Sequence, residues 1–301
     1  IADRAKFGSW MVFAAIWSVL VYFPVAHWVF AFDDFVSMTG GWIANDLGAI
    51  DFAGGTAVHI NAGAAGLALA IILGKRVGWR REAMRPHSLP LVMLGAALLW
   101  FGWFGFNAGS AVGSNGTAGL ALLNTIGATV AAVLAWLLVE KIRDGHATSL
   151  GAASGVVAGL VAITPACAAV DASGALIVGA LAGVLCSLSV GLKFKLGIDD
   201  SLDVVAVHLV GGIVGTLMIG VVGVDVGLFN GGGTDQLIKQ IIGAGAVLGY
   251  SFIATLIIGY ALDKTIGLRV SREVEVEGID LKLHAESAYE TYSSSRGGSS
   301  I

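Results

Sequence analysis

The sequence is short of charged residues, of proline and of cysteine. Only 13% of its 301 residues are charged, whereas a soluble domain has roughly 25%. Its two cysteines, Cys167 and Cys186, lie in or beside apolar segments, so we expect small buried thiols and neither a disulfide framework nor a cysteine-rich metal site. Segments that alternate between apolar and polar residues are also lacking, which argues against a transmembrane β-barrel.

What the sequence has in excess is long apolar runs. Hydrophobic residues make up 56% of the chain and the mean hydropathy is +0.84. The runs are about twenty residues long, the length that a helix needs to cross about 30 Å of hydrocarbon. We therefore expect an all-α, polytopic helical bundle in a lipid membrane. Its eight predicted spans cover residues 8–30, 52–74, 89–109, 117–139, 150–169, 173–192, 203–223 and 237–261.

Basic residues gather at every second loop between these spans. By the positive-inside rule those loops face the cytoplasm, and an even number of spans puts both ends of this chain there. We expect a transmembrane domain over residues 1–268 and a polar cytoplasmic tail over residues 269–301, in a plasma or inner membrane. The chain opens without an initiator methionine, and we expect further residues to precede it.

One pattern occurs twice, in the second and the seventh predicted spans. Residues 51–66 read DFAGGTAVHINAGAAG and residues 200–215 read DSLDVVAVHLVGGIVG, which share the template D-x7-H-x3-G-x2-G. A lone histidine in a span often serves only to bond a neighbouring helix, but two at matched positions, His59 and His208, indicate a function. The loop charges make the two spans antiparallel, which is typical of an inverted repeat with its site where the halves meet.

We expect the two imidazoles to meet in the middle of the bundle. Each offers one donor and one acceptor, and apolar neighbours such as Val58 and Leu209 favour the neutral ring. Such a pair suits a small neutral solute that forms hydrogen bonds better than it suits a hydrated cation. A metal site is the alternative, but two histidines without a third ligand make a poor set. No metal, cofactor or nucleic acid is predicted.

Two acidic residues open the two copies of the template. Asp51 and Asp200 each precede their histidine by eight residues, about 12 Å along a helix, which is too far for contact. In the first turn of a helix a carboxylate caps free N–H groups and stabilises the positive end of the helix dipole. The alternative is an electrostatic role, in which a buried negative charge stabilises a cation at a pore mouth.

Aromatic residues crowd the end of the third span, which reads LLWFGWFGFNAGSA at 98–111. For Trp100 and Phe101 we favour an aromatic belt at the membrane interface. Phe106 and Ser110 are four residues apart and share a helix face. Near an outer vestibule they would hold a small cation by cation–π attraction and one hydrogen bond.

Several long motifs, in the same order along the chain, resemble the Amt branch of the ammonium transporter (Amt/Rh) superfamily. They are DFAGGTAVHINAG, GKRVGW, WFGFNAGSA, ITPAC, the second D-x7-H before GGIVG, and a tail with GLRV, EVEGID and HAESAY. The likeness runs from about residue 5 to 290. It implies eleven spans in homotrimers with one pore per subunit, so the eight spans here would be the fourth to the eleventh.

The resemblance also assigns roles to single residues. His59 and His208 correspond to the paired pore histidines, and Asp51 and Asp200 to structural or electrostatic acids of the two halves. The outer part of the path corresponds to Phe106 of the gate, Ser110 of the ammonium recruitment site and Thr164 on the lining. This chain departs from the pattern in two respects. It reads HWVF where a tryptophan usually ends the motif, so Phe30, with Trp28 two residues earlier, provides a weaker π face. The first three spans of the family, with the partner phenylalanine of the outer gate, are not in this chain.

The function that the resemblance implies is transport and not enzymatic catalysis. Ammonium would be recruited outside, lose its proton and cross the apolar pore as ammonia, with or without the proton. The tail resembles the segment that binds a PII-type nitrogen regulator at the cytoplasmic face. An ammonium sensor that transports little and signals through its tail is the main alternative; a gas channel of the Rh type and a membrane protein without a pore are less favoured.

Overall fold

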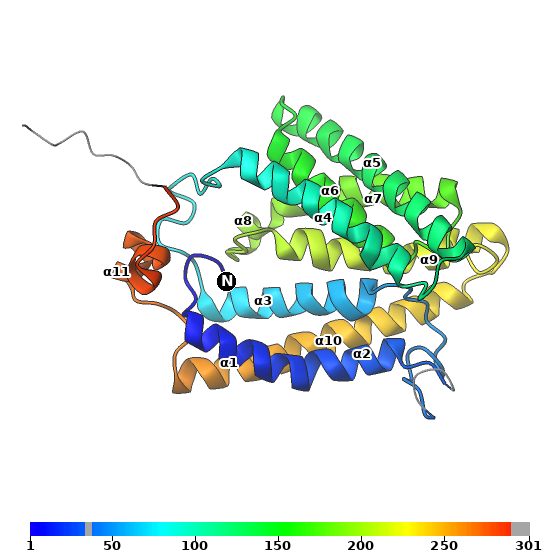
Figure 1. Ribbon diagram of the computed structural model, residues 1–301, viewed down its shortest axis with the longest axis horizontal. Coiled ribbons are helices and arrows are strands. Elements are labelled where there is room, and N and C mark those ends of the chain that lie inside the picture. Colours follow the sequence, from blue (N-terminus) through cyan, green and yellow to red (C-terminus); the bar gives the residue numbers. More distant parts are fainter. Residues whose placement is uncertain (34–37, 290–301) are drawn as a thin grey trace, which may run out of the picture.

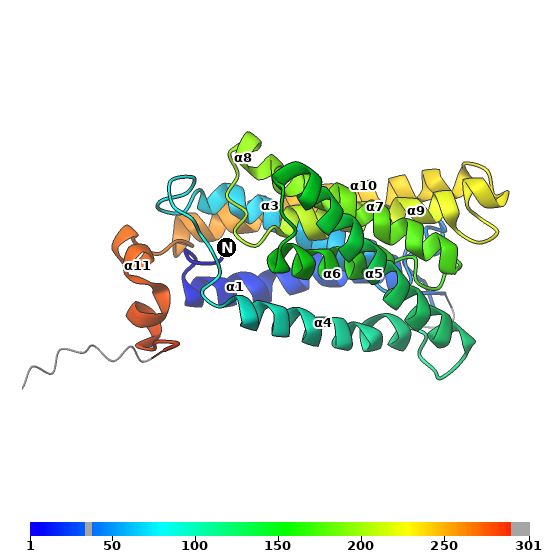
Figure 2. The same ribbon diagram turned by 90° about the horizontal axis from the view of Figure 1, so that it is seen from above.

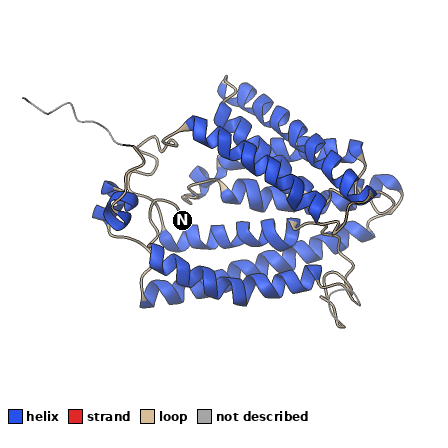
Figure 3. Cartoon of the chain, viewed as in Figure 1, coloured by secondary structure: helices blue, strands red, loops and turns tan. Residues whose placement is uncertain are grey.

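The structure is a bundle of roughly parallel and antiparallel helices (Figures 1 and 3). This computed structural model describes residues 1–33 and 38–289, and within them the chain is helical apart from its loops and isolated β-bridge positions, such as the bridge between Ala5 and Arg269. The α-helices are α1 Phe7–Trp17, α2 Phe23–Phe30, α3 Asn61–Leu73, α4 Leu89–Gly109, α5 Gly116–Asp144, α6 Ser149–Ile163, α7 Ala172–Val190, α8 Leu192–Leu196, α9 Gly211–Val222, α10 Asp235–Thr265 and α11 Arg272–Glu277. The described residues also form four π-helical segments and one 3₁₀ turn. The π-helical segments are η1 Ser18–Tyr22, η2 Gly55–Ile60, η3 Val205–Val210 and η5 Asp280–His284, and the 3₁₀ turn is η4 Leu228–Asn230.

Each of the eight predicted spans corresponds to a helix or a continuous helical run. Seven runs in the described residues are long and apolar enough to cross a membrane, and α6, with 15 residues, is shorter. The span predicted over 150–169 ends early because Pro165 has no backbone N–H to donate to the carbonyl of Val161 and its ring crowds the preceding turn. Residues 164–169 form turns instead. The fold class is therefore confirmed as an all-α membrane bundle.

Polar side chains mark where several of these helices begin. Ser88, Asn115, Thr148 and Asp171 each precede a helix and accept a hydrogen bond from a backbone N–H three residues on. These caps satisfy donors that the first turn of a helix leaves free. At the opposite end of α5, Gly145 has φ +81°, a conformation that ends helices and that glycine adopts without strain.

The helices pack in two groups, and α9 contacts both. Helices α5, α6 and α7 pack against one another and α4 packs against α5 and α6, whereas α10 packs along α3 and α1 (Figures 1 and 2). Small residues permit close approach in the first group, since a Cβ on Gly179 or Gly183 would collide with the backbone at Ala128 or Ala132. Cys167 and Cys186 are free and buried in these cores, as predicted.

The two copies of the template lie side by side and run in opposite directions. Figure 1 shows the chain entering η2–α3 at the end of the molecule where α9 finishes, while η3–α9 starts near the end of α3. Helix α9 contacts η2, and α3 contacts η3. The antiparallel arrangement expected from the loop charges is therefore present, and it brings the middles of the two template copies together.

Candidate functional site

The two template histidines meet where the antiparallel segments cross. Nδ1 of His59 lies 3.2 Å from Nδ1 of His208, and the ring centroids are 5.3 Å apart. His59 is buried and His208 is half-buried. Both residues belong to a π-helical segment, η2 or η3, which continues directly as an α-helix. Wide π turns of this kind are frequent at functional sites.

Glycines of the template let the two segments approach closely. A Cβ added to Gly63 would lie 2.5 Å from the backbone nitrogen of Leu209, the residue after His208. Reciprocally, a Cβ on Gly212 would lie 3.1 Å from the backbone nitrogen of Ile60, the residue after His59. The H-x3-G spacing therefore gives each segment one histidine for the site and one gap for the opposite segment.

Asp51 holds the start of η2 by its carboxylate. Oδ1 accepts hydrogen bonds from the backbone N–H groups of Gly54 and Gly55 at 2.8 and 2.7 Å, and Oδ2 from those of Thr56 and Ala57 at 2.8 and 3.0 Å. The side chain is buried. All four bonds orient the turn that carries His59, as expected for a capping acid.

Asp200 holds η3 by fewer bonds of its own. Its Oδ2 accepts one backbone hydrogen bond, from Val205 at 2.7 Å, and its carbonyl accepts one from Lys193. The neighbouring residue Asp199 carries most of the contacts, because Arg76 binds its carboxylate by two side-chain bonds and one backbone bond of 2.8–2.9 Å. Buried Arg4 donates to the Asp199 carbonyl at 2.6 Å.

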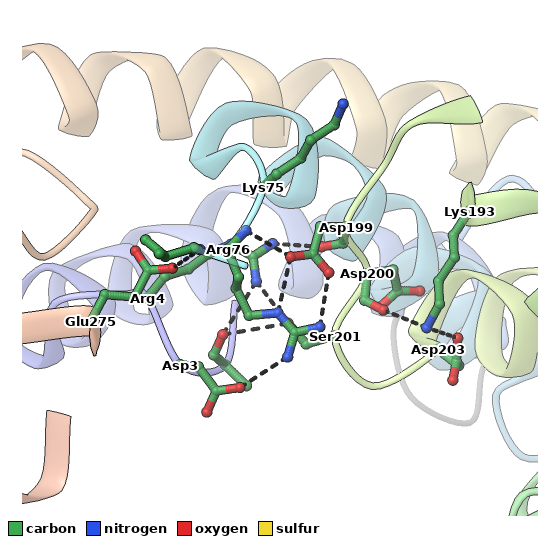
Figure 4. A network of polar contacts seen from close by, with 12 residues as sticks. Asp3, Arg4, Lys75, Arg76, Lys193, Asp199, Asp200, Ser201, Asp203 and Glu275 are labelled. Atoms are coloured by element: carbon green, nitrogen blue, oxygen red, sulfur yellow. Dashed lines mark hydrogen bonds and ion pairs between the residues drawn. The ribbon is translucent and has the colours of Figure 1, made fainter. Parts of the chain in front are cut away.

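Figure 4 shows that this polar network joins segments far apart in sequence. Arg4 also donates to Ser201 at 2.7 Å, and Arg76 forms an ion pair with Asp3 at 3.0 Å. Burial alone would raise the pKa of Asp199, but the hydrogen bonds and charge of Arg76 outweigh it and hold that pKa below its ordinary value. The start of η3 is thus anchored by buried charges, whereas that of η2 is anchored by local capping.

The histidines open onto an apolar pocket of about 470 Å³. The ring of Trp103 stacks on that of His59, with centroids 5.5 Å apart and planes at 16°, and Phe106 lies 6.1 Å from His59. Apart from the two imidazoles the lining is apolar: Val58, Ala62, Leu98, Leu99, Gly102, Trp103 and Phe106. A small solute in this pocket would find hydrogen-bonding side chains only at the histidines.

Trp103 is the site residue that sequence reasoning missed. It lies in the aromatic run of α4, where an interfacial belt explained its neighbours equally well. The available signal was the spacing to Phe106, three residues on, which places both rings on one helix face. Only the packing of α4 against η2 distinguishes Trp103 from the exposed Phe101 on the other face.

Of the five residues predicted for the outer part of the path, Phe106 joins the histidines and the other four do not line the pocket. Ser110 donates its hydroxyl hydrogen to the carbonyl of Phe106 at 2.8 Å. Thr164 is fully buried, bound to Leu160 and Trp103. Phe30 packs near Gly54 at the start of η2, and Trp28 packs against Trp42 and Tyr250.

Metal ligands do not gather anywhere in the part of the chain that the structure describes. Residues 1–33 and 38–289 contain no group of three or more His, Cys, Asp or Glu side chains placed to hold an ion. The two histidines are bonded to each other and surrounded by apolar groups. The arrangement therefore provides a neutral hydrogen-bonding pair inside an apolar pocket.

A sequence model of the Ammonium Transporter Family matches residues 1–289, nearly the whole chain. The chain belongs to this family. Two ammonium transporters are similar to this chain over most of its length. The ammonium transporter of Mycobacterium tuberculosis is 64% identical over 96% of this chain, and that of Aquifex aeolicus is 50% identical over 95%. The matched regions are 63% and 66% of these two relatives, so the chain spans about two thirds of their length.

Solved structures of the family have the same fold. A structure named Sensor Amt Protein superimposes with a TM-score of 0.87 at 32% identity, covering 96% of this chain and 72% of that one. Mep2 of Saccharomyces cerevisiae gives a TM-score of 0.80 at 35% identity, covering 90% of this chain and 64% of the other. The resemblance that the motifs indicated is thereby confirmed, and the family is one of transporters.

Proposed function

We propose that the protein transports ammonium, and that the substrate passes the two histidines as neutral ammonia. The observation that carries the proposal is the Nδ1–Nδ1 contact of 3.2 Å between His59 and His208 at an otherwise apolar pocket. Membership of the ammonium transporter family and the names of its relatives support the substrate.

The histidine pair matches ammonia by its hydrogen-bonding capacity. In the contact between the two Nδ1 atoms one ring must donate and the other accept, so the two neutral rings are opposite tautomers. One Nε2 then carries a hydrogen and the other a lone pair. Ammonia has both a lone pair and hydrogens, so the pair offers it an acceptor and a donor, whichever ring holds which tautomer.

Desolvation provides the reason for loss of the proton. Moving a monovalent cation out of water into an apolar environment costs several kcal/mol even after relaxation, whereas a neutral polar molecule loses roughly 2–7 kcal/mol when it makes no hydrogen bond there. The histidines reduce the second cost by bonding ammonia. Ammonium therefore gives up its proton to water on the outer side before the apolar part of the path, and Phe106 stands at that boundary.

Recruitment and assembly follow the family pattern in this proposal. Ser110 and the rings of Phe30 and Trp28 hold ammonium on the outer side, and Thr164 and Asp51 support the path between them and the histidines. The protein forms homotrimers in a plasma or inner membrane, with its tail in the cytoplasm. A PII-type regulator binds at that face, where Glu275 of the tail accepts a hydrogen bond from Val77 in the basic loop at 2.6 Å.

A sensor is the second candidate function. Its support is the superposition on the structure named Sensor Amt Protein, at a TM-score of 0.87. A sensor would bind the substrate at the same pocket but carry little of it across the membrane. Ammonium binding with neither ammonium-evoked current nor methylammonium uptake would identify a sensor, because a transporter carries the substrate across whether or not the proton follows it.

The test is ammonium-evoked current and methylammonium uptake with the complete protein in liposomes. Replacing both His59 and His208 by leucine fills the pocket with apolar groups and removes every hydrogen bond to ammonia, so we expect transport to fall by about tenfold or more. His146→Leu, in an exposed loop, is the control and should transport like the wild type. Undiminished transport by the double variant would contradict the proposed role of the histidines.

A further inference from the structure

One tryptophan contacts two other rings of the pocket, those of His59 and Phe106. Trp103 stacks on His59 at a centroid distance of 5.5 Å and contacts Phe106 at 5.3 Å. Only 9% of its surface is exposed. Because the ring covers a face of His59 whose Nδ1 is already bonded to His208, a tilt of Trp103 would change the orientation of the imidazole and the width of the pocket.

A single hydroxyl fixes the position of this tryptophan. The indole Nε1 of Trp103 donates a hydrogen bond to Oγ1 of Thr164 at 2.9 Å. The same hydroxyl donates its own hydrogen to the Leu160 carbonyl at 2.7 Å, which leaves its oxygen as an acceptor for the indole. Thr164 has no exposed surface, so its side chain is outside the reach of a solute in this pocket.

The turn after α6 places that hydroxyl with little freedom. Helix α6 ends at Ile163 because Pro165 has no N–H to continue its hydrogen bonding, and the backbone N–H of Thr164 still bonds to the carbonyls of Leu160 and Val161. The hydroxyl therefore projects from a fixed helix end onto α4. Its contact is specific to the indole nitrogen, since an indole has one hydrogen-bond donor and no acceptor.

We propose that Thr164 is a positioning residue for the pocket: it holds the Trp103 ring flat against His59 and thereby sets which amine the histidine pair admits. The proposal rests on the proposed function of the pocket. Thr164 acts through Trp103 and does not contact the substrate. Loss of the hydroxyl would let the indole tilt, loosen His59 and widen the passage for an amine larger by one methyl group.

The experiment compares Thr164→Val with Thr164→Ser in the complete protein in liposomes, with ammonium and methylammonium as the substrates. Valine keeps the shape of the threonine side chain but removes the hydroxyl that accepts the indole hydrogen bond. Serine keeps that hydroxyl. We expect Thr164→Val to lower ammonium transport by about tenfold and to raise the ratio of methylammonium to ammonium transport by about threefold or more. Thr164→Ser should keep most of the wild-type ammonium transport and a substrate ratio close to that of the wild type.

The ratio separates a positioning role from a structural one. Misfolded protein carries neither substrate, so a loss of folded protein lowers both rates and leaves their ratio unchanged. Thr129→Val is the matched control, because Thr129 is also fully buried and donates to a helix carbonyl, that of Thr125, at 2.7 Å, but lies outside the pocket lining. Its ratio should equal that of the wild type.

Trp103→Phe tests the same hydrogen bond from its other end. If the bond is what matters, Trp103→Phe should shift the ratio in the same direction, and the double variant with Thr164→Val should shift it less than the two single effects combined. An unchanged ratio in Thr164→Val, or fully additive effects, would overturn the positioning role while the transport function stands. A wild-type protein that carries neither substrate would overturn the proposed function and this role with it.

Discussion

Asp51 and Asp200 occupy the same position in the repeat but accept different numbers of hydrogen bonds. The carboxylate of Asp51 accepts four from the backbone of η2, and that of Asp200 accepts one from η3. Capping was one of two roles that the sequence suggested for both residues. Sequence patterns cannot distinguish the two aspartates in this respect, because the number of N–H groups within reach of each carboxylate depends on the backbone conformation of its turn.

This difference predicts unequal effects of removing each charge. Asp51→Asn keeps one acceptor oxygen and leaves two buried N–H groups of η2 without a partner, so we expect a loss of about 1–3 kcal/mol in unfolding free energy. Asp200→Asn should cost less, about 1 kcal/mol. Thermal unfolding of the two purified variants measures the difference, and an equal or larger loss for Asp200→Asn would contradict it.

The histidines could be predicted from the sequence and their partner on α4 could not. His59 and His208 stand out because a costly residue recurs at one spacing in two apolar spans. Trp103 stands among other aromatic residues that membrane helices use at interfaces, and its hydrogen bond to Thr164 joins positions 61 residues apart. Single-residue patterns carry no information about such a contact.

At the scale of helices, the crossing of η2–α3 with η3–α9 determines the geometry of the site. Hydrophobic runs predicted the spans, and loop charges predicted their antiparallel directions. The π-helical segments were not predicted, because π and α turns have the same apolar composition. The early end of α6 was missed although Pro165 indicated it, since the apolar run continues beyond the proline.

The crossing predicts which glycines tolerate a side chain. An added Cβ at Gly63 would lie 2.5 Å from the Leu209 nitrogen, so Gly63→Ala must push the two segments apart. We expect its apparent Tm to fall by about 5 °C, with loss of transport. Gly245→Ala on α10, where nothing lies within 4 Å of the added atom, is the control and should keep both Tm and transport. A Gly63→Ala protein with wild-type transport would contradict the close crossing.

At the scale of the whole molecule, buried charges connect the N-terminal segment, two loops and the base of the tail. The backbone of residues 4–6 pairs with that of residues 268–270, and Arg4 reaches from there to Asp199. Arg269 in turn binds Glu275, the last carbonyl of α3 and one carbonyl of the loop after it. Sequence patterns do not identify these partners, because every loop on this side is basic. Residues 290–301 of the tail lie outside the described residues.

The network predicts how stability depends on pH. The pKa of Asp199 is lower in the folded state than in the unfolded chain. Its contribution to the stability of the fold is therefore complete above its ordinary pKa, about 3.9, and is lost as the pH falls through the lower pKa of the folded state. At pH 7, Asp199→Asn should lower the apparent Tm by about 5 °C or more. The difference in Tm between the variant and the wild type should shrink below about pH 4, because wild-type Asp199 then becomes protonated.

A matched exposed pair provides the control for that experiment. Asp144 binds Arg143 at 2.6 Å, but both side chains are more than a third exposed, at 49% and 41%. Exposed pairs stabilise little, so Asp144→Asn should change Tm by about 1 °C at most. A pH-independent deficit in Asp199→Asn would show that its charge does not stabilise the fold.

The crossing restricts how the length of this chain can change over generations. A residue deleted between His59 and Gly63 would turn one of them by about 100° about the helix axis relative to the other. Either the imidazole or the gap for the opposite segment would then face away from the crossing. A change of length at this place therefore disrupts the site, and both copies of the template, 149 positions apart, have the same H-x3-G spacing.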